Sequence, residues 1–258
     1  MRVRLKFQKY GPMKFLGHLD VMRYFQKAFR RAKFDNEYTQ GYNPHQILSF
    51  AAPLGLGLTS DGEYMDIKLK SAESPDIMIK RINSVLTEGF KVTGFYPLDD
   101  PEEGRKAPTA MSLVMAADYL VSLRDGYQQQ MPFKNQEEFQ KAFTDFYKQD
   151  EILIEKQTKK SSKIMDIKKM MGQGSPVGQG DRSLVPSDTV AEQYKNGIKL
   201  YLQLDTGSRS NLKPELVMEA FCNYHSIEYQ ESAWQFHRID LYARNNENGK
   251  LIPLKDVN

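Results

Sequence analysis

Two periods of hydrophobicity follow one another at the start of this chain, and they constrain its fold more than any other feature. From Arg2 to Lys9 apolar and charged residues alternate, which predicts a half-buried strand with a basic outer face. Gly11 and Pro12 then interrupt the pattern. From about His18 to Ala32 apolar residues recur at helical spacing, which predicts an amphipathic helix. The chain therefore begins with a strand followed by a helix.

The other elements of the first hundred residues complete a familiar order. A second helix is expected from Ser74 to about Leu86, because Ser74 suits the N-cap and Pro75 the first helical position. Further strands are expected at 36–40, 47–51, 63–69 and 90–98. The order is β-α-β-β-α-β with one strand split, which is the order of a ferredoxin-like domain.

A second set of elements follows a polar, proline-containing joint and repeats this order. We expect helices at 135–147 and 213–224, and strands at 112–123, 152–157, 197–204 and 236–244. The sequence thus predicts an α+β protein of two tandem ferredoxin-like (βαββαβ) units. The expected domains are 1–100 and 111–258, with a linker at 101–110.

One stretch interrupts the second unit. Six lysines against one acid occur over 156–169, and four glycines with a proline follow within 172–180. Such a glycine-rich segment supports neither a helix nor a central strand. We therefore expect a mobile loop over about 158–193.

Composition excludes several classes of protein. The single cysteine excludes an internal disulfide framework, a cysteine-ligated metal cluster and a self-contained iron–sulfur enzyme. No apolar run approaches the roughly 20 residues of a membrane helix, and the alternating N-terminus lacks a signal-peptide core. We expect a reduced, cytoplasmic protein without a membrane span.

The positive charge is concentrated near the N-terminus. The formal net charge is only +3, but residues 1–50 hold ten Lys or Arg against three acids. On the first helix four cations share a face with Asp20 as the only acid: Arg23, Lys27, Arg30 and Arg31. An ordinary solvated face interleaves acids for pairing, so this one favours an anionic partner, and RNA is the obvious candidate.

Two short motifs that contain histidine flank this helix: the first is Gly17 to Asp20 and the second is Gly41 to His45. In the second motif, Gly41 permits a positive φ and Pro44 restricts Asn43 to extended conformations. The motif is either a structural turn or a rigid loop that presents Tyr42, Asn43 and His45 for stacking and for base or phosphate contact.

The first motif places His18 at the start of the basic helix. A helix N-terminus attracts anions, so His18 is a candidate general acid–base or phosphate ligand, with Lys14 and Arg23 nearby; the alternative is a packed, capping histidine. If the fold brings His18 and His45 together, the pair could bind a metal with Asp20, although their spacing matches no known ligand signature. We therefore expect no metal site.

Residues 9–32 and 38–67 resemble the radical-SAM-linked protein family, a bacterial family without an established function. The resemblance rests on KYGPMKFLGHLDVMRYFQKAFRRA and YTQGYNPHQILSFAAPLGLGLTSDGEYMDI. Matching positions are Lys9, Gly11, Phe15 to Asp20, Arg23, Arg30, Arg31, Gly41 to His45, Ser49 to Ala51, Pro53 to Gly57, Ser60, Glu63 and Tyr64. Tyr42 stands where the family usually has phenylalanine, and Gln46 where it usually has a small residue or proline.

Members of that family occur beside, or fused to, a radical-SAM protein of the cobalamin-dependent type. The resemblance therefore implies an accessory or substrate-presenting module for such an enzyme, with no cofactor of its own. The duplicated arrangement also looks like that of the CRISPR repeat-processing endoribonucleases, which cleave RNA without metal, often with a histidine near the first helix. This second likeness is one of topology alone.

The leading hypothesis is a non-enzymatic RNA-binding or substrate-presenting partner of a radical-SAM enzyme. Phosphates would be bound by Lys14, Arg23, Lys27, Arg30 and Arg31, while Tyr42 stacks and Asn43, His18 and His45 orient the ligand. The first alternative is a metal-independent endoribonuclease with His18 or His45 as general base. The second is a protein–protein scaffold whose basic face docks on the radical enzyme.

Overall fold

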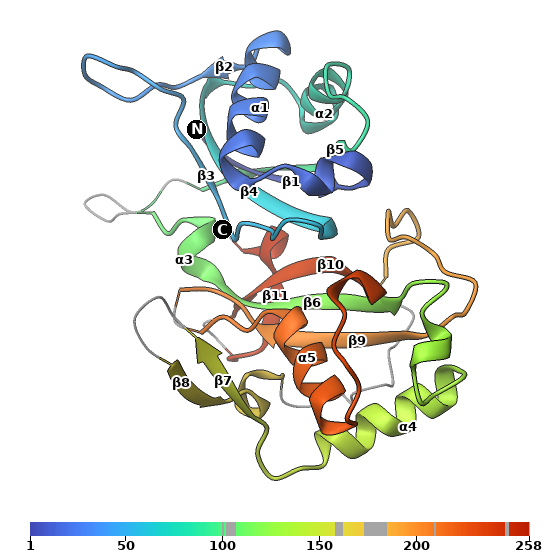
Figure 1. Cartoon of the computed structure of the whole chain (residues 1–258). Helices are drawn as coiled ribbons and strands as arrows, with labels where there is room; N and C mark the ends of the chain where they lie inside the picture. Colours follow the sequence, from blue (N-terminus) through green and yellow to red (C-terminus); the bar gives the residue numbers. More distant parts are fainter. Residues whose placement is uncertain are drawn as a thin grey trace. The chain divides into compact units, whose positions relative to one another are not determined.

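The computed structural model describes residues 1–99, 101, 107–157, 162–172, 185–208, 210–245 and 248–257. Their internal contacts define two compact units, one of Met1–Met115 with Asp240–Asn258 and one of Ala116–Ile239. The C-terminal segment thus belongs to the first unit, whereas the sequence-based division keeps 111–258 together. Figure 1 shows helices and strands in both units, which makes this a mixed α+β protein. Within the described ranges, no helix is both long enough and apolar enough to span a membrane.

The sheet of the first unit is built around β1 (Arg2–Lys9). This strand lies between β4 (Thr59–Ser71) and β5 (Phe90–Leu98) and is antiparallel to both. Two short strands, β2 (Asp35–Asn36) and β3 (Leu48–Phe50), pair antiparallel with β4. The predicted strand at 36–40 is thus shorter than expected and shifted toward the N-terminus.

Two helices, α1 (His18–Arg31) and α2 (Pro75–Asn83), pack on one face of this sheet, and both begin where their sequence signals predict. Alternation along β1 turns Val3, Leu5 and Phe7 toward them, and all three are fully or almost fully buried. Phe25 of α1 packs against Phe7 with ring centroids 4.8 Å apart. The amphipathic pattern of α1 is therefore what seats it on the sheet.

The opposite face of β1 is not the exposed basic surface that its alternation predicts. Arg4 is fully buried: its guanidinium donates to Asp66 and to the backbone carbonyls of Leu254 and Val257. The two carbonyls belong to the segment Asp240–Asn258, which is part of the same unit. A C-terminal segment thus covers cations that lie more than two hundred residues earlier, and local periodicity cannot reveal such a cover.

Two short elements, a helix and a strand, complete the first unit, and a longer strand leads from it into the second. Residues 110–113 form the short helix α3 (Ala110–Leu113), so the expected strand at 112–123 begins slightly later, as β6 (Val114–Leu123). Thr109 caps this helix by a reciprocal hydrogen-bond pair with Ser112, which explains why a helical turn precedes the strand. Near the C-terminus, β11 (Leu251–Pro253) pairs antiparallel with β10 (Trp234–Arg244).

The sheet of the second unit has β6 between β9 (Lys199–Asp205) and the first part of β10. Its helices are α4 (Gln136–Tyr147) and α5 (Pro214–Tyr224). The two helices share an aromatic core in which the ring centroids of Phe143 and Phe221 lie 5.3 Å apart. The predicted helices at 135–147 and 213–224 are confirmed to within a residue at their starts.

The second unit departs from the predicted pattern at β7 (Leu153–Gln157). This strand pairs with β8 (Ser162–Asp166) in a separate two-stranded sheet. The expectation of a loop over about 158–193 is thus wrong for Ser162–Asp166, because these residues pair antiparallel with β7, which precedes them closely in the sequence. The glycine-rich residues 173–180 lie outside the described part of the chain.

Candidate nucleic-acid interface

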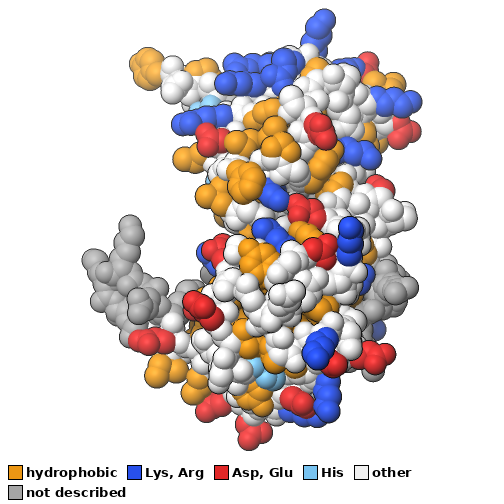
Figure 2. All heavy atoms as spheres, turned by 45° about the vertical axis from the view of Figure 1, so that its right-hand side comes forward, with side chains coloured by type: hydrophobic (Ala, Val, Ile, Leu, Met, Phe, Trp, Pro, Cys, Tyr) orange, Lys and Arg blue, Asp and Glu red, His pale blue; other side chains and the backbone are white. Residues whose placement is uncertain are grey.

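Three cations form a row on the exposed face of α1, and we call Arg23, Lys27 and Arg30 the cationic stripe. Spacings of four and three residues place them on one side of the helix, opposite buried Phe25 and Phe29. Arg23 lies 3.5 Å from Asp20 in an exposed ion pair. Lys27 and Arg30 have neither an ion pair nor a side-chain hydrogen bond with any described residue. Figure 2 shows Lys and Arg side chains gathered on the surface of this unit.

The two remaining predicted phosphate ligands, Arg31 and Lys14, lie outside the cationic stripe. The Arg31 guanidinium lies 6.0 Å from the Tyr24 ring centroid and donates to the Val85 carbonyl at 3.1 Å. Lys14 lies in the 3-10 turn Gly11–Phe15, with its ammonium 5.5 Å from the ring centroid of Phe15. Arg31 therefore joins α1 to the α2 side of the unit, and Lys14 marks a separate position before the helix.

A long loop between β2 and β3 projects beside α1. Its base is closed by hydrogen bonds from the Ile47 N–H to Glu37 and from the Thr39 N–H to His45. The Gln46 side chain donates to the Gln26 carbonyl of α1 at 3.2 Å, which fixes the loop to the middle of the helix. Figure 1 shows the loop extending away from the rest of its unit. We call residues 38–46 the tyrosine loop.

The tip of the tyrosine loop presents an aromatic ring to solvent. Tyr42 is completely exposed, and Asn43 and Pro44 beside it are also exposed. Gly41 has φ +117°, a conformation that favours glycine, so the expected positive φ is confirmed. A hydrophobic ring held at the end of an anchored loop has no packing role within the described residues and is free to stack on a ligand.

His45 has a structural position within the tyrosine loop. Its Nδ1 lies 3.2 Å from the Asn43 carbonyl oxygen and 3.3 Å from the Thr39 hydroxyl. Its backbone N–H also donates to that hydroxyl. These contacts connect the two sides of the loop below its tip, so the imidazole helps to hold Tyr42 and Asn43 in place.

His18 begins α1 and lies in a different environment. Its ring packs edge-on against Phe50 with centroids 5.0 Å apart. The recess beside it has a volume of about 20 Å³, which is room for one water molecule. Two charged residues also line the recess, Lys9 and Glu63, and both are buried. Lys9 Nζ donates to the Leu16 carbonyl at 2.9 Å.

The structure does not bring the two histidines together. The tyrosine loop is anchored at Gln26, eight residues after His18, and this is about 12 Å along a helix at 1.5 Å per residue. Among the described residues, no group of three or more His, Cys, Asp or Glu side chains could hold a metal ion. A joint site of His18, His45 and Asp20 is therefore not formed.

Three residues near these positions were given no role from sequence patterns alone. Lys9 and Glu63 lie far apart in sequence and line the same recess because β1 pairs with β4. Both are among the positions that match the radical-SAM-linked family, which is the one sequence signal that marks them. Phe15 is 68% exposed and lies beside the Lys14 ammonium. An exposed ring next to a cation is a further stacking candidate that a helical or strand period cannot detect.

Sequence comparisons place the chain among proteins without an assigned activity. No curated protein matches it. The family model described as "Uncharacterized protein conserved in bacteria (DUF2344)" matches residues 2–214, which is most of the chain. The protein therefore belongs to the DUF2344 family of uncharacterized conserved bacterial proteins.

Proposed function

We propose that this protein is an accessory RNA-binding module that presents RNA to a radical-SAM enzyme of the cobalamin-dependent type. The observation that carries the proposal is the exposed cationic stripe on α1, in which only Arg23 has an acidic partner among the described residues, beside the anchored tyrosine loop. Cations contact phosphates without regard to sequence, and an exposed ring stacks on a base. Together they suit a single strand or an unpaired loop of RNA.

The fold supports an RNA site on the helical side of the first unit. The strand order β5-β1-β4, with β2 and β3 also on β4, supports a ferredoxin-like arrangement for the first unit. We extend this proposal to the second unit, with β7 and β8 displaced into their own hairpin. RNA-binding sheets of similar design use the open sheet face. Here Arg4 on that face is buried beneath Leu254 and Val257, so α1 and the tyrosine loop take that role.

The enzymatic step is assigned to the partner. Support comes from the resemblance to the radical-SAM-linked family and from the chain's single cysteine, Cys222, which is buried. Three cysteines are needed to hold the cluster of a radical-SAM enzyme, so residues 1–258 cannot hold one by themselves, and we assign that chemistry to the radical-SAM protein. The proposed complex is an enzyme that modifies RNA and a subunit that holds the RNA.

The direct test is fluorescence anisotropy with a fluorescein-labelled single-stranded RNA of mixed sequence. Affinity is expected to fall steeply between about 50 and 200 mM salt, because each phosphate contact contributes about 0.7 to the logarithmic slope for a single strand. Replacing Lys27 and Arg30 by alanine should reduce that slope by about 1.4. Lys80→Ala with Lys91→Ala is the matched control, since both lysines are exposed in the same unit but outside the stripe. Tyr42→Ala should weaken binding at every salt concentration.

Three other results would contradict the proposal. Absence of RNA binding, or binding that does not change with salt, would remove the RNA component. RNA cleavage in EDTA that is lost in His18→Ala would identify the endoribonuclease alternative. Co-purification of a radical-SAM protein that depends on Lys27 and Arg30, without RNA, would identify a scaffold.

A further inference from the structure

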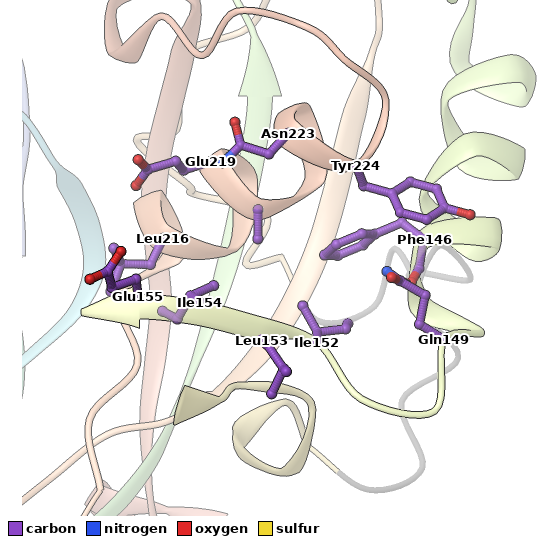
Figure 3. Close-up of a pocket in the computed structure, with 11 residues that line it drawn as sticks. Phe146, Gln149, Ile152, Leu153, Ile154, Glu155, Leu216, Glu219, Asn223 and Tyr224 are labelled. Atoms are coloured by element: carbon purple, nitrogen blue, oxygen red, sulfur yellow. The ribbon is translucent and has the colours of Figure 1, made fainter. Parts of the chain in front are cut away.

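The second unit contains a pocket that the proposed RNA interface does not use. Its volume is about 390 Å³, within the range of roughly 300–1,000 Å³ typical of ligand sites. It lies where the end of α4, the strand β7 and the helix α5 meet (Figure 3). Its walls include apolar side chains from all three elements, together with Gln149, Asn223, Glu155 and Glu219.

The pocket runs along an edge of β7. Four consecutive residues, Ile152 to Glu155, line it. Successive side chains of a strand point to opposite faces, so the adjoining Leu153, Ile154 and Glu155 of β7 line one pocket together where it reaches the strand's edge. Figure 3 shows α5 on one side of β7 and β8 on the other. We call this pocket the β7 groove.

The backbone along this edge carries hydrogen-bonding groups without a partner in the described structure. The Ile167 N–H donates to the Ile152 carbonyl at 2.8 Å, and Leu153 is registered opposite Asp166. Because bonded and non-bonded pairs alternate in an antiparallel ladder, the N–H and C=O groups of Leu153 and Glu155 point away from β8. An open edge of this kind is a template for another strand.

The two ends of the β7 groove differ in chemistry. Figure 3 places Phe146, Tyr224 and Gln149 at one end, and Glu155 and Glu219 at the other. No Lys or Arg is among the described residues that line it. A complementary ligand therefore combines an apolar side chain with a cationic one. Leu153, which is 53% exposed, extends the apolar surface out of the groove.

We propose that the β7 groove binds an extended segment of a partner protein, in which apolar residues accompany lysine or arginine. The segment adds as a strand to the open edge of β7 and bonds to the backbone of Leu153 and Glu155. An apolar side chain enters between Phe146 and Ile152, and a cationic side chain lies against Glu155 and Glu219. The open backbone edge is what favours a peptide over a small amine.

The experiment uses the full chain and a fluorescein-labelled peptide of about ten residues, a usual upper length for a strand, in which valine and lysine alternate. Saturable binding is the expected result. The same peptide with glutamate for lysine should lose binding at least tenfold. A third peptide, N-methylated at alternate residues on the edge facing β7, should also lose binding, because it lacks the required donors.

Variants localise the site. Glu155→Gln and Glu219→Gln should each weaken the lysine peptide about three-fold, the size of effect usual for partly exposed ion pairs. Glu228→Gln is the matched control, since this exposed acid of the same unit lies outside the groove. Circular dichroism on each variant checks that it is folded. Equal binding of the glutamate or N-methylated peptide, or unchanged binding in the double glutamine variant, would overturn the proposal. So would displacement of the peptide by spermidine at equal concentration, which would indicate a small-amine site.

Discussion

The Lys6 ammonium lies 2.7 Å from the Asp240 carboxylate, although 234 positions separate the two residues in the chain. The hydroxyl of Tyr64 donates to the same carboxylate at 2.7 Å. Burial first, and then the Asp240 charge, raise the pKa of Tyr64 far above its usual range. This triad joins β1 and β4 to the segment that begins at residue 240, within the first unit.

Replacing Asp240 by asparagine should lower the free energy of unfolding by about 2–3 kcal/mol, because Lys6 is then left mostly buried without a counter-charge. This expected loss of stability is smaller than that for breaking a fully buried ion pair, because both side chains remain slightly exposed. Urea denaturation measures it. The double variant Lys6→Met/Asp240→Asn should recover part of the loss. Additive effects of the two substitutions would show that the ion pair contributes nothing of its own.

Gly89 and Gly11 provide a matched pair for testing backbone constraint. Gly89 has φ +100°, and a Cβ there would lie 2.4 Å from Met13 Cγ and 2.9 Å from the Tyr10 carbonyl oxygen. Gly89→Ala should therefore destabilise the protein by about 2–4 kcal/mol, from strain and overpacking together. Gly11 has φ +54° with open space around it, so Gly11→Ala should cost only about 1 kcal/mol. Equal losses of stability would mean that the close approach at Gly89 relaxes freely.

Sequence patterns revealed the parts of this fold that depend on neighbours along the chain. The start of α2 follows from Ser74 and Pro75, and the face that α1 buries follows from its spacing. Local sequence patterns could not reveal that Leu254 covers Arg4, because that contact depends on a segment 250 positions away. The β7–β8 hairpin was hidden for a different reason: its lysine-rich composition resembles a solvated loop.

In the candidate interface, too, some residues could be predicted from local spacing and others depend on contacts between distant segments. Arg23, Lys27 and Arg30 are readable from helical spacing, since a helix fixes which of its residues share a face. The contact of Arg31 with Val85 depends on tertiary packing, so helical spacing alone does not indicate which way this side chain turns. Lys9 and Glu63 share a recess only through the pairing of β1 with β4.

Asp125 should contribute stability that disappears in acid. Its pKa is lowered, chiefly because the carboxylate accepts the Lys195 backbone N–H, with further hydrogen bonds from Asn196. A lowered pKa in the folded state means that the stabilisation is present above the ordinary value of 3.8 and is lost as pH falls through the depressed value. Asp125→Asn should lower Tm at neutral pH and flatten the acid decline of Tm. If the Tm of the variant and of the parent protein fell in parallel as the pH is lowered below 3.8, Asp125 would not be a source of the acid-sensitive stability.

Cys222 should be unreactive while the protein is folded. The side chain is fully buried on α5, and burial, followed by the nearby Glu219 charge, raises the pKa of its thiol to about 12. Because the thiolate is the reactive form, a thiol reagent at mildly alkaline pH should modify the native protein only through unfolding. In denaturant the same reagent should react with one thiol per chain, because the sequence has a single cysteine. The raised pKa also means that stability is lost as pH rises from the ordinary value of 9.0 toward about 12. Rapid labelling in the absence of denaturant, at a rate independent of protein stability, would show that α5 opens locally and that the thiol is accessible without unfolding.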